Sequence, residues 1–123
     1  MKFGIFVIDE VLTSCEIFDS LGGKEKSVPP HLSEYINGLR VDVKYSSIRV
    51  QAPTSDLCWI FCVTRFLSIL IGENQTRFSK YFYLKFVERN DRKLVSLISE
   101  YIKKVDICKE KLLGVGWGGF FKA

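Results

Sequence analysis

The sequence predicts an α+β domain in which a small, mostly antiparallel sheet packs on a central helix that carries a cysteine at its N-terminus. Three observations support this class. Two short apolar, β-branched and aromatic runs open the chain, at residues 3–8 and 15–18. A segment at about residues 56–71 is apolar almost all round, which is typical of a helix covered on most sides. An amphipathic segment follows Asn90. The chain has 123 residues, of which 47% are hydrophobic, and this is enough for one packed core. We therefore interpret residues 1–123 as a single domain.

The first half of the chain contains clear start and stop signals. The turn-rich stretch 19–23 ends the second run, so the two runs are close enough in the chain to form a hairpin. Pro29-Pro30 predicts the start of a helix, and Asn37-Gly38 predicts its end. Alternating apolar residues then predict a half-buried strand at residues 41–45. The alternation resumes in the opposite phase at residues 48–50, which predicts a bulge or a tight turn.

The second half is centred on the apolar helix. A hydroxyl of Thr54 or Ser55 is expected to cap its N-terminus. The aromatic segment 77–87 fits a strand and a helix equally, and both remain open. Asn90-Asp91 is expected to cap the last helix, and the glycine-rich stretch 114–121 is expected to be irregular. The inner face of the last helix is predicted to contain Leu94, Leu97, Ile98, Tyr101, Ile102 and Val105.

Composition excludes several classes of protein. The net charge is +4 and the basic residues are spread between acids, so nothing in the composition supports nucleic-acid binding. The longest apolar stretch, residues 57–71, is interrupted by polar residues and is short for a membrane span. The four cysteines come without a secretory leader, so we expect reduced thiols and an intracellular protein, in the nucleus or cytoplasm.

Cys58 is the residue with the strongest chemical signal. A polar loop delivers it to the first turn of the central helix, where free backbone N–H groups stabilise a thiolate and lower the cysteine pKa. Gln51 lies just before the loop, where its amide could donate to a developing oxyanion. The alternative is that Cys58 is an ordinary buried core cysteine, as Cys62 is expected to be. The two thiols with His31 match no zinc spacing, so no metal is expected.

The run from Gln51 to Cys62, Q-x-P-x-S-x-x-C-x-x-F-C, resembles the nucleophile motif of adenain, the adenovirus cysteine protease. The resemblance extends to the proteases of Maverick/Polinton elements and, more distantly, to the ubiquitin-like-protein proteases. The stretch from Glu16 to Gly22 is similar to the family strand that ends in the acidic triad member. The resemblance covers roughly residues 2–70. It implies that Cys58 is the nucleophile, Gln51 the oxyanion-hole donor and Asp19 the acid that orients a histidine.

The chain departs from this family at three places. Lys2, followed by Phe3, stands at the position of the family histidine, and Trp59 stands where the family has glycine after the cysteine. A lysine remains protonated at its reference pKa of about 10.4. His31 follows Asp19 in the chain and is expected to be an exposed or capping residue. The family's N-terminal segment has no counterpart, so we interpret the chain as the C-terminal part of an adenain-like domain: a truncated gene model, a decayed viral or transposon copy, or a retained pseudoprotease.

The resemblance implies a cysteine endopeptidase that acts on polypeptides, either a viral or transposon polyprotein or ubiquitin-like substrates, and that is impaired because the histidine is missing. The alternative is an inactive pseudoprotease that serves as a protein-interaction module. Adenovirus relatives use DNA and a peptide as cofactors, and nothing in this composition supports either here, so no cofactor is expected. The expected partner is a polypeptide substrate or another protein, and a virus-associated location fits the resemblance.

Overall fold

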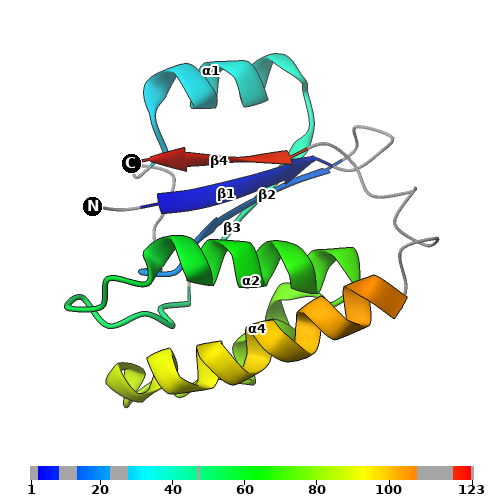
Figure 1. The fold of residues 1–123 in the computed structure, drawn as a ribbon. Helices are drawn as coiled ribbons and strands as arrows, with labels where there is room; N and C mark the ends of the chain where they lie inside the picture. The colour runs from blue at the N-terminus through cyan, green and yellow to red at the C-terminus, as the bar shows by residue number, and fades with distance from the viewer. Residues whose placement is uncertain (1–2, 9–13, 23–27, 47, 108–117, 123) are drawn as a thin grey trace.

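The computed structural model describes residues 3–8, 14–22, 28–46, 48–107 and 118–122. They form a mixed helix-and-strand structure, as the sequence predicts (Figure 1). The elements in chain order are β1 (Phe3–Ile8), β2 (Ser14–Asp19), α1 (Pro30–Gly38), β3 (Asp42–Tyr45), α2 (Cys58–Leu70), α3 (Gln75–Ser79), a short 3-10 helix η2 (Val87–Arg89), α4 (Asn90–Ile107) and β4 (Gly118–Lys122).

The strands form one sheet in the order β3-β2-β1-β4. Strands β1 and β2 form the predicted antiparallel hairpin, with Gly4 paired to Asp19. Strand β4 is antiparallel to β1, whereas β3 is parallel to β2 and is reached through α1. A parallel pair needs such a crossover connection. The parallel pair was not anticipated from the sequence.

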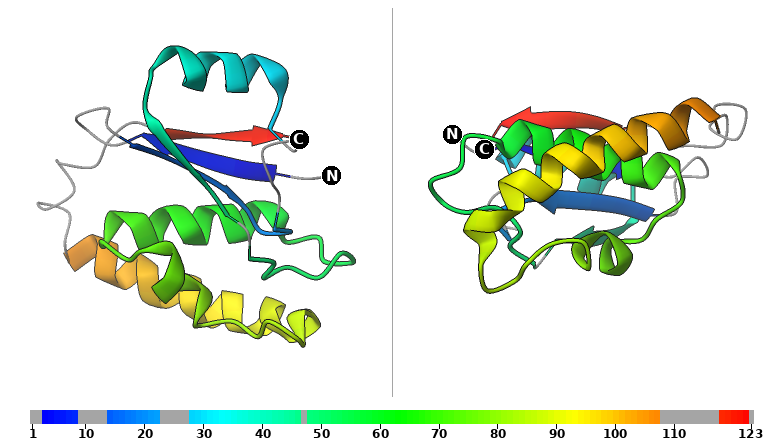
Figure 2. Two further views of the ribbon diagram at one scale, coloured as in Figure 1. Left: turned by 180° about the vertical axis from the view of Figure 1, so that it is seen from behind. Right: turned by 60° about the horizontal axis from the view of Figure 1, so that its bottom comes forward.

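The sheet is covered on both faces (Figures 1 and 2). Helix α1 lies on one face, and α2 with α4 lies on the other. Successive residues of a strand point to opposite faces, and β2 follows this rule. Cys15 and Ile17 pack with α1, while Phe18 joins the core beneath α2. The same alternation directs Glu16 to α2, where it meets Arg65.

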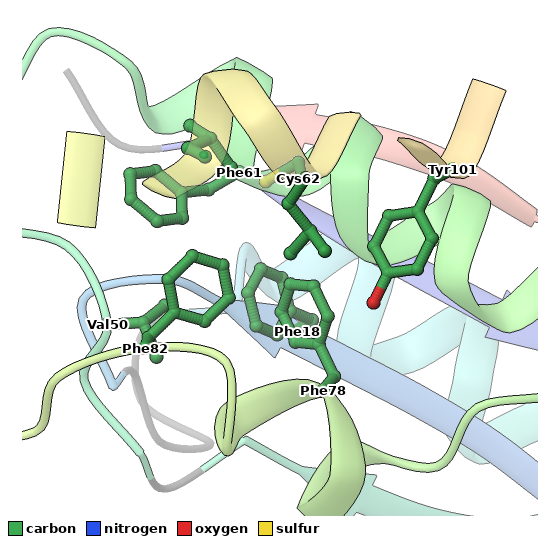
Figure 3. Close-up of a cluster of buried hydrophobic side chains, with 9 residues drawn as sticks. Phe18, Val50, Phe61, Cys62, Phe78, Phe82 and Tyr101 are labelled. Atoms are coloured by element: carbon green, nitrogen blue, oxygen red, sulfur yellow. The ribbon is translucent and has the colours of Figure 1, made fainter. Parts of the chain in front are cut away.

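The larger core lies between the sheet, α2 and α4 (Figure 3). It is rich in aromatic rings, and the Phe78 ring makes edge contacts with Phe18 at 5.8 Å and Phe82 at 5.2 Å between centroids. Such geometry adds to the hydrophobic stabilisation of buried rings. The buried members of this core are Phe18, Val50, Phe61, Cys62, Phe78, Phe82, Leu94, Leu97 and Tyr101.

Helix α2 is the predicted central helix, and Trp59 is its one exposed residue. Its polar residues lie on the buried side, where Thr64 and Ser68 have no exposed surface. Arg65 is 1% exposed and is held by Glu16, with Nε to Oε2 at 2.8 Å and Nη2 to Oε1 at 2.6 Å. A buried cation needs such pairing. Among the described residues, no helix has both the length and the hydropathy required to cross a membrane.

Four expectations about the fold need correction here, and a fifth, the Asn90 cap of α4, is corrected with the candidate site. The end of the chain is not irregular throughout, because residues 118–122 form β4 on the edge of β1; residues 114–117 lie outside the described residues. Backbone pairing stabilises this strand despite its glycines. Residues 48–50 form no strand, since the N–H groups of Val50 and Gln51 both donate to the Ser20 carbonyl, at 2.9 and 3.0 Å. Only an isolated bridge, Leu21 to Arg49, forms there among the described residues.

The remaining two corrections concern helices. Helix α2 begins at Cys58 with Leu57 as its N-cap residue, and no side chain caps it; Ser55 Oγ instead accepts the N–H of Leu57 itself, at 3.2 Å. In α4, Ile102 is 54% exposed and does not belong to the inner face. The open segment 77–87 is the end of α3 followed by turns, with η2 beginning at Val87.

Candidate functional site

The candidate site lies at the N-terminus of α2, where the end of β2 and the loop before the helix meet. Cys58 is the first residue of α2 and is 4% exposed. Asp19 and Gln51, the two other residues implied by the resemblance, are 4% and 2% exposed. All three are therefore buried, although they come from separate segments of the chain.

Ser20 joins Gln51 to Cys58. Its hydroxyl donates to Gln51 Oε1 in a short hydrogen bond, and its oxygen lies 3.7 Å from the Cys58 sulfur. Gln51 Nε2 donates to the Ser55 carbonyl at 2.9 Å. Because a carbonyl can only accept, this last bond fixes the orientation of the Gln51 amide. Ser20 itself has no exposed surface.

The proton arrangement follows from the number of hydrogens available. A serine hydroxyl has one hydrogen, and Ser20 gives it to Gln51. The Cys58 thiol is therefore the donor in its contact with Ser20. A hydrogen bond donated by the neutral thiol favours the neutral form over the thiolate. In this arrangement the Ser20 oxygen is the acceptor for the Cys58 thiol when that thiol is neutral.

Cys62, one turn further along α2, is coupled to Cys58. Its pKa is raised far above the ordinary value, first because its thiol donates to Cys58, then because it is buried, and further by the charges of Cys58 and Asp19. The two thiols of α2 are thus coupled, and burial together with nearby negative charge favours the protonated form of Cys62. The prediction that Cys62 is a core residue is confirmed, since it has no exposed surface and belongs to the larger core.

Asp19 ends β2 beside the thiol pair. Its Oδ1 accepts the N–H of Leu21 at 2.9 Å, as expected for an aspartate that begins a turn. Gly22 takes a positive φ of 76° in this turn, a conformation that glycine adopts without strain. Asp19 can be both a turn residue and a member of the site. Its carboxylate accepts a hydrogen bond within the turn and its negative charge also raises the pKa of Cys62.

The positions expected to supply a base give a different result. Lys2 lies outside the described residues, although Phe3 starts β1 one residue before Gly4, the partner of Asp19. His31 is exposed, as expected, and belongs to α1 on the opposite face of the sheet from α2 (Figure 2). It is therefore not positioned to take a proton from Cys58.

The loop that carries Gln51 is held in place by α4. Ser55 Oγ donates to the Asp91 carboxylate, 2.9 and 3.0 Å from its two oxygens. Asn90, which has no exposed surface, donates to the Val50 carbonyl at 2.8 Å. This side chain was expected to cap α4 and instead ties the loop to the helix start. The position of Gln51 relative to Cys58 thus depends on a helix 40 residues later in the chain.

Chemically, the site offers a thiol at an uncapped helix N-terminus, an amide and a carboxylate. The partial positive charge of the first helical turn stabilises an anion beside it. One N–H of Gln51 is used by Ser55, and a primary amide carries a second. The arrangement can support thiolate chemistry when Cys58 releases its proton, but the described residues place no histidine within reach to accept it.

Sequence reasoning did not identify Ser20, which is the residue that connects the site. Its signal was available, because it is a polar residue directly after a buried strand and beside the candidate acid. In the described part of the chain, no group of three or more His, Cys, Asp or Glu residues is arranged to hold a metal ion. No known protein-family model, curated protein or solved structure matches this chain.

Proposed function

We propose that the chain is an adenain-like cysteine peptidase domain in which Cys58 is the nucleophile, Gln51 the oxyanion donor and Asp19 the orienting acid. The observation that carries the proposal is the hydrogen-bonded group at the start of α2. Ser20 contacts both Gln51 and Cys58, and it directly follows Asp19 in the chain. The residue that follows the acid of one motif thus contacts both residues of the other motif, which is the arrangement expected if the two motifs form one site.

The identity of the reactive thiol has independent support from the coupled pair. Of the two cysteines in the first turns of α2, Cys62 has its pKa raised by Cys58, by burial and by Asp19. The two thiols titrate as a pair, and we assign the first ionisation to Cys58 because it lies at the N-terminus of α2. The thiolate is the nucleophilic form of cysteine, so the site directs reactivity to the residue that the motif selects.

A second candidate function, a pseudoprotease that binds polypeptides without cleaving them, is favoured by different observations. Cys58 is 4% exposed and donates its proton to Ser20, and His31 is on the far face of the sheet. A triad acts as a unit, so loss of the base lowers turnover by orders of magnitude. The two functions share one site and differ in whether cleavage is retained.

The site is tested by alkylation of the folded protein with iodoacetamide across a range of pH, with mass spectrometry to locate the modified cysteine. We expect Cys58 to react faster than Cys62 and to reach half of its maximal rate below about pH 8. Cys58→Ala should abolish the fast reaction, and Cys62→Ala should retain it. A Cys58 that reacts only in urea, or more slowly than Cys62, would contradict the assignment of the nucleophile.

Cleavage distinguishes the two functions. Wild-type protein and the Cys58→Ala variant are compared for hydrolysis of fluorescently quenched casein. Hydrolysis by the wild type alone identifies an endopeptidase. Equal background signals from both proteins, together with fast alkylation of Cys58, identify the pseudoprotease.

A further inference from the structure

A second surface is formed by the segment between α3 and α4. Three large apolar side chains in this segment point to solvent: Tyr83 is 40% exposed, Leu84 61% and Phe86 51%. Single exposed apolar residues are common, but several within one short segment indicate an interaction site. We call these three residues the aromatic rim.

The aromatic rim is built on a fixed backbone. Asn90 is fully buried beneath it and makes two hydrogen bonds to the backbone of Tyr83, from its N–H at 2.7 Å and to its carbonyl at 2.8 Å. The N–H of Arg89 donates to the Phe86 carbonyl at 3.0 Å and closes the turn into η2. The exposed side chains are therefore displayed by an anchored loop, which lowers the entropy lost when a partner binds.

Cations accompany the exposed rings. Lys93 Nζ lies 4.0 Å from the centroid of the Tyr83 ring, and the Arg89 guanidinium lies 5.0 Å from that of Phe86. Residues 80–93 contain five basic side chains and two acidic ones, giving a local charge of +3. One of the two acids, Asp91, accepts a hydrogen bond from Ser55. The surface around the aromatic rim is thus positively charged.

An open groove of about 410 Å³ lies along α4, and Lys93 connects it to the aromatic rim, because Lys93 lines the groove and lies against the Tyr83 ring. Tyr81 and Leu97 give the groove an apolar part, and Arg92 and Lys93 give it positive charge. Across the described ranges, neither of these two cations forms an ion pair. Glu100 lines the groove at a greater distance along the helix and pairs with Lys104 at 3.9 Å. The groove therefore combines an apolar contact surface with two cations that have no acidic partner.

We propose that this groove and the aromatic rim dock an acidic stretch of a polypeptide that also carries apolar side chains. Carboxylates of the partner pair with Arg92 and Lys93, while its apolar side chains cover Tyr81, Leu97 and the rim. Electrostatic complementarity of this kind sets specificity and speeds association. A nucleic acid fits less well, because the basic residues form no continuous stripe along the surface. A second copy of the chain would bring two positive surfaces together.

The test uses a fluorescein-labelled peptide of alternating glutamate and leucine, with binding followed by fluorescence polarisation. We expect saturable binding that weakens as salt is added, and no binding of the same peptide with lysine in place of glutamate. Arg92→Glu combined with Lys93→Glu should weaken binding about tenfold or more. Cys58→Ala should bind as tightly as the wild type, which separates this proposal from the thiol site.

Lys103→Glu is the matched control. Lys103 is exposed on the same side of α4, about three turns beyond Arg92 and outside the groove, so its reversal changes the net charge as much as the single reversal Arg92→Glu does and should leave binding unchanged. If Arg92→Glu and Lys103→Glu lowered the affinity for the peptide equally, net charge alone would explain the effect and the proposal would be overturned. Tighter binding of a single-stranded oligonucleotide than of the acidic peptide, or a dimer that Arg92→Glu dissociates, would also overturn it. Circular dichroism melts check that each variant is folded.

Discussion

Ser20→Ala is the substitution that most directly tests the chemistry of the candidate site. Ser20 has no exposed surface, donates to Gln51 and lies 3.7 Å from the Cys58 sulfur. Alanine fits the same space without the hydroxyl. The variant therefore removes one hydrogen-bond donor and one acceptor while leaving Cys58, Gln51 and Asp19 unchanged.

Two magnitudes follow from these contacts. The Gln51 carbonyl oxygen loses its donor in a buried position, which costs about 2 kcal/mol of the free energy of unfolding. Cys58 loses the acceptor of its thiol proton, a bond of about 1 kcal/mol that stabilises only the neutral form. A difference of that size favours the thiolate about fivefold, so alkylation of Cys58 near neutral pH should be about five times faster than in the wild type.

The assay is the pH dependence of alkylation by iodoacetamide, with urea unfolding as the measure of stability. Easier access of the reagent would raise the rate at every pH, including the alkaline plateau. Loss of the proton acceptor raises the rate only below the plateau. A slower reaction in Ser20→Ala would refute the reasoning, because it would mean that the hydroxyl donates to the thiolate. Ser99→Ala, an exposed position on α4, should match the wild type.

The other predictions concern buried groups around the site. Glu16→Gln leaves the Arg65 guanidinium buried without its counter-charge, and we expect the free energy of unfolding measured in urea to fall by about 3 kcal/mol. The exposed control Glu34→Ala should lower it by less than about 0.5 kcal/mol. Similar losses in both variants would contradict the role given to the ion pair. The fold raises the pKa of the Cys62 thiol above its value of 9.0 in the unfolded chain. The contribution of this thiol to the free energy of unfolding is therefore complete below about pH 9 and is lost as the pH rises further. Stability should therefore fall above about pH 9 by up to about 1.4 kcal/mol per pH unit more in the wild type than in Cys62→Ala, and parallel curves would disprove the shift. Asn90→Ala removes three buried hydrogen bonds and should cost about 3 kcal/mol by thermal or urea unfolding, whereas an unchanged midpoint would show that the loop is held by other contacts.

Much of the local structure could be predicted from local patterns. The hairpin of β1 and β2 follows from two β-rich runs on either side of a short connection, and α1 begins at Pro30 as the proline pair predicts. The start of α2 at Cys58 follows from the polar loop before an apolar helix. These features depend on backbone preferences and on periodicity, which neighbouring residues determine.

The misjudged features depend on partners far away in the chain. Strand β4 has a weak local signal because of its glycines, and its pairing with the edge of β1 is what makes it a strand. The exposed surface of Ile102 follows from where α4 lies, which its apolar pattern alone cannot reveal. Propensity is a weak guide wherever tertiary pairing supplies the hydrogen bonds or leaves a face uncovered.

The sequence by itself determined the α+β class, the position of Cys58 at a helix start, and the spacing that links it to Gln51. Only the tertiary structure decided that Ser20 bridges these two residues, that the thiols of Cys58 and Cys62 are coupled, and that His31 lies across the sheet. The physical reason is the range of each interaction. Helix starts and turns are set by the next few residues, whereas hydrogen bonds and charge coupling at the site join groups that are distant in the chain and meet only when the sheet and α2 pack together.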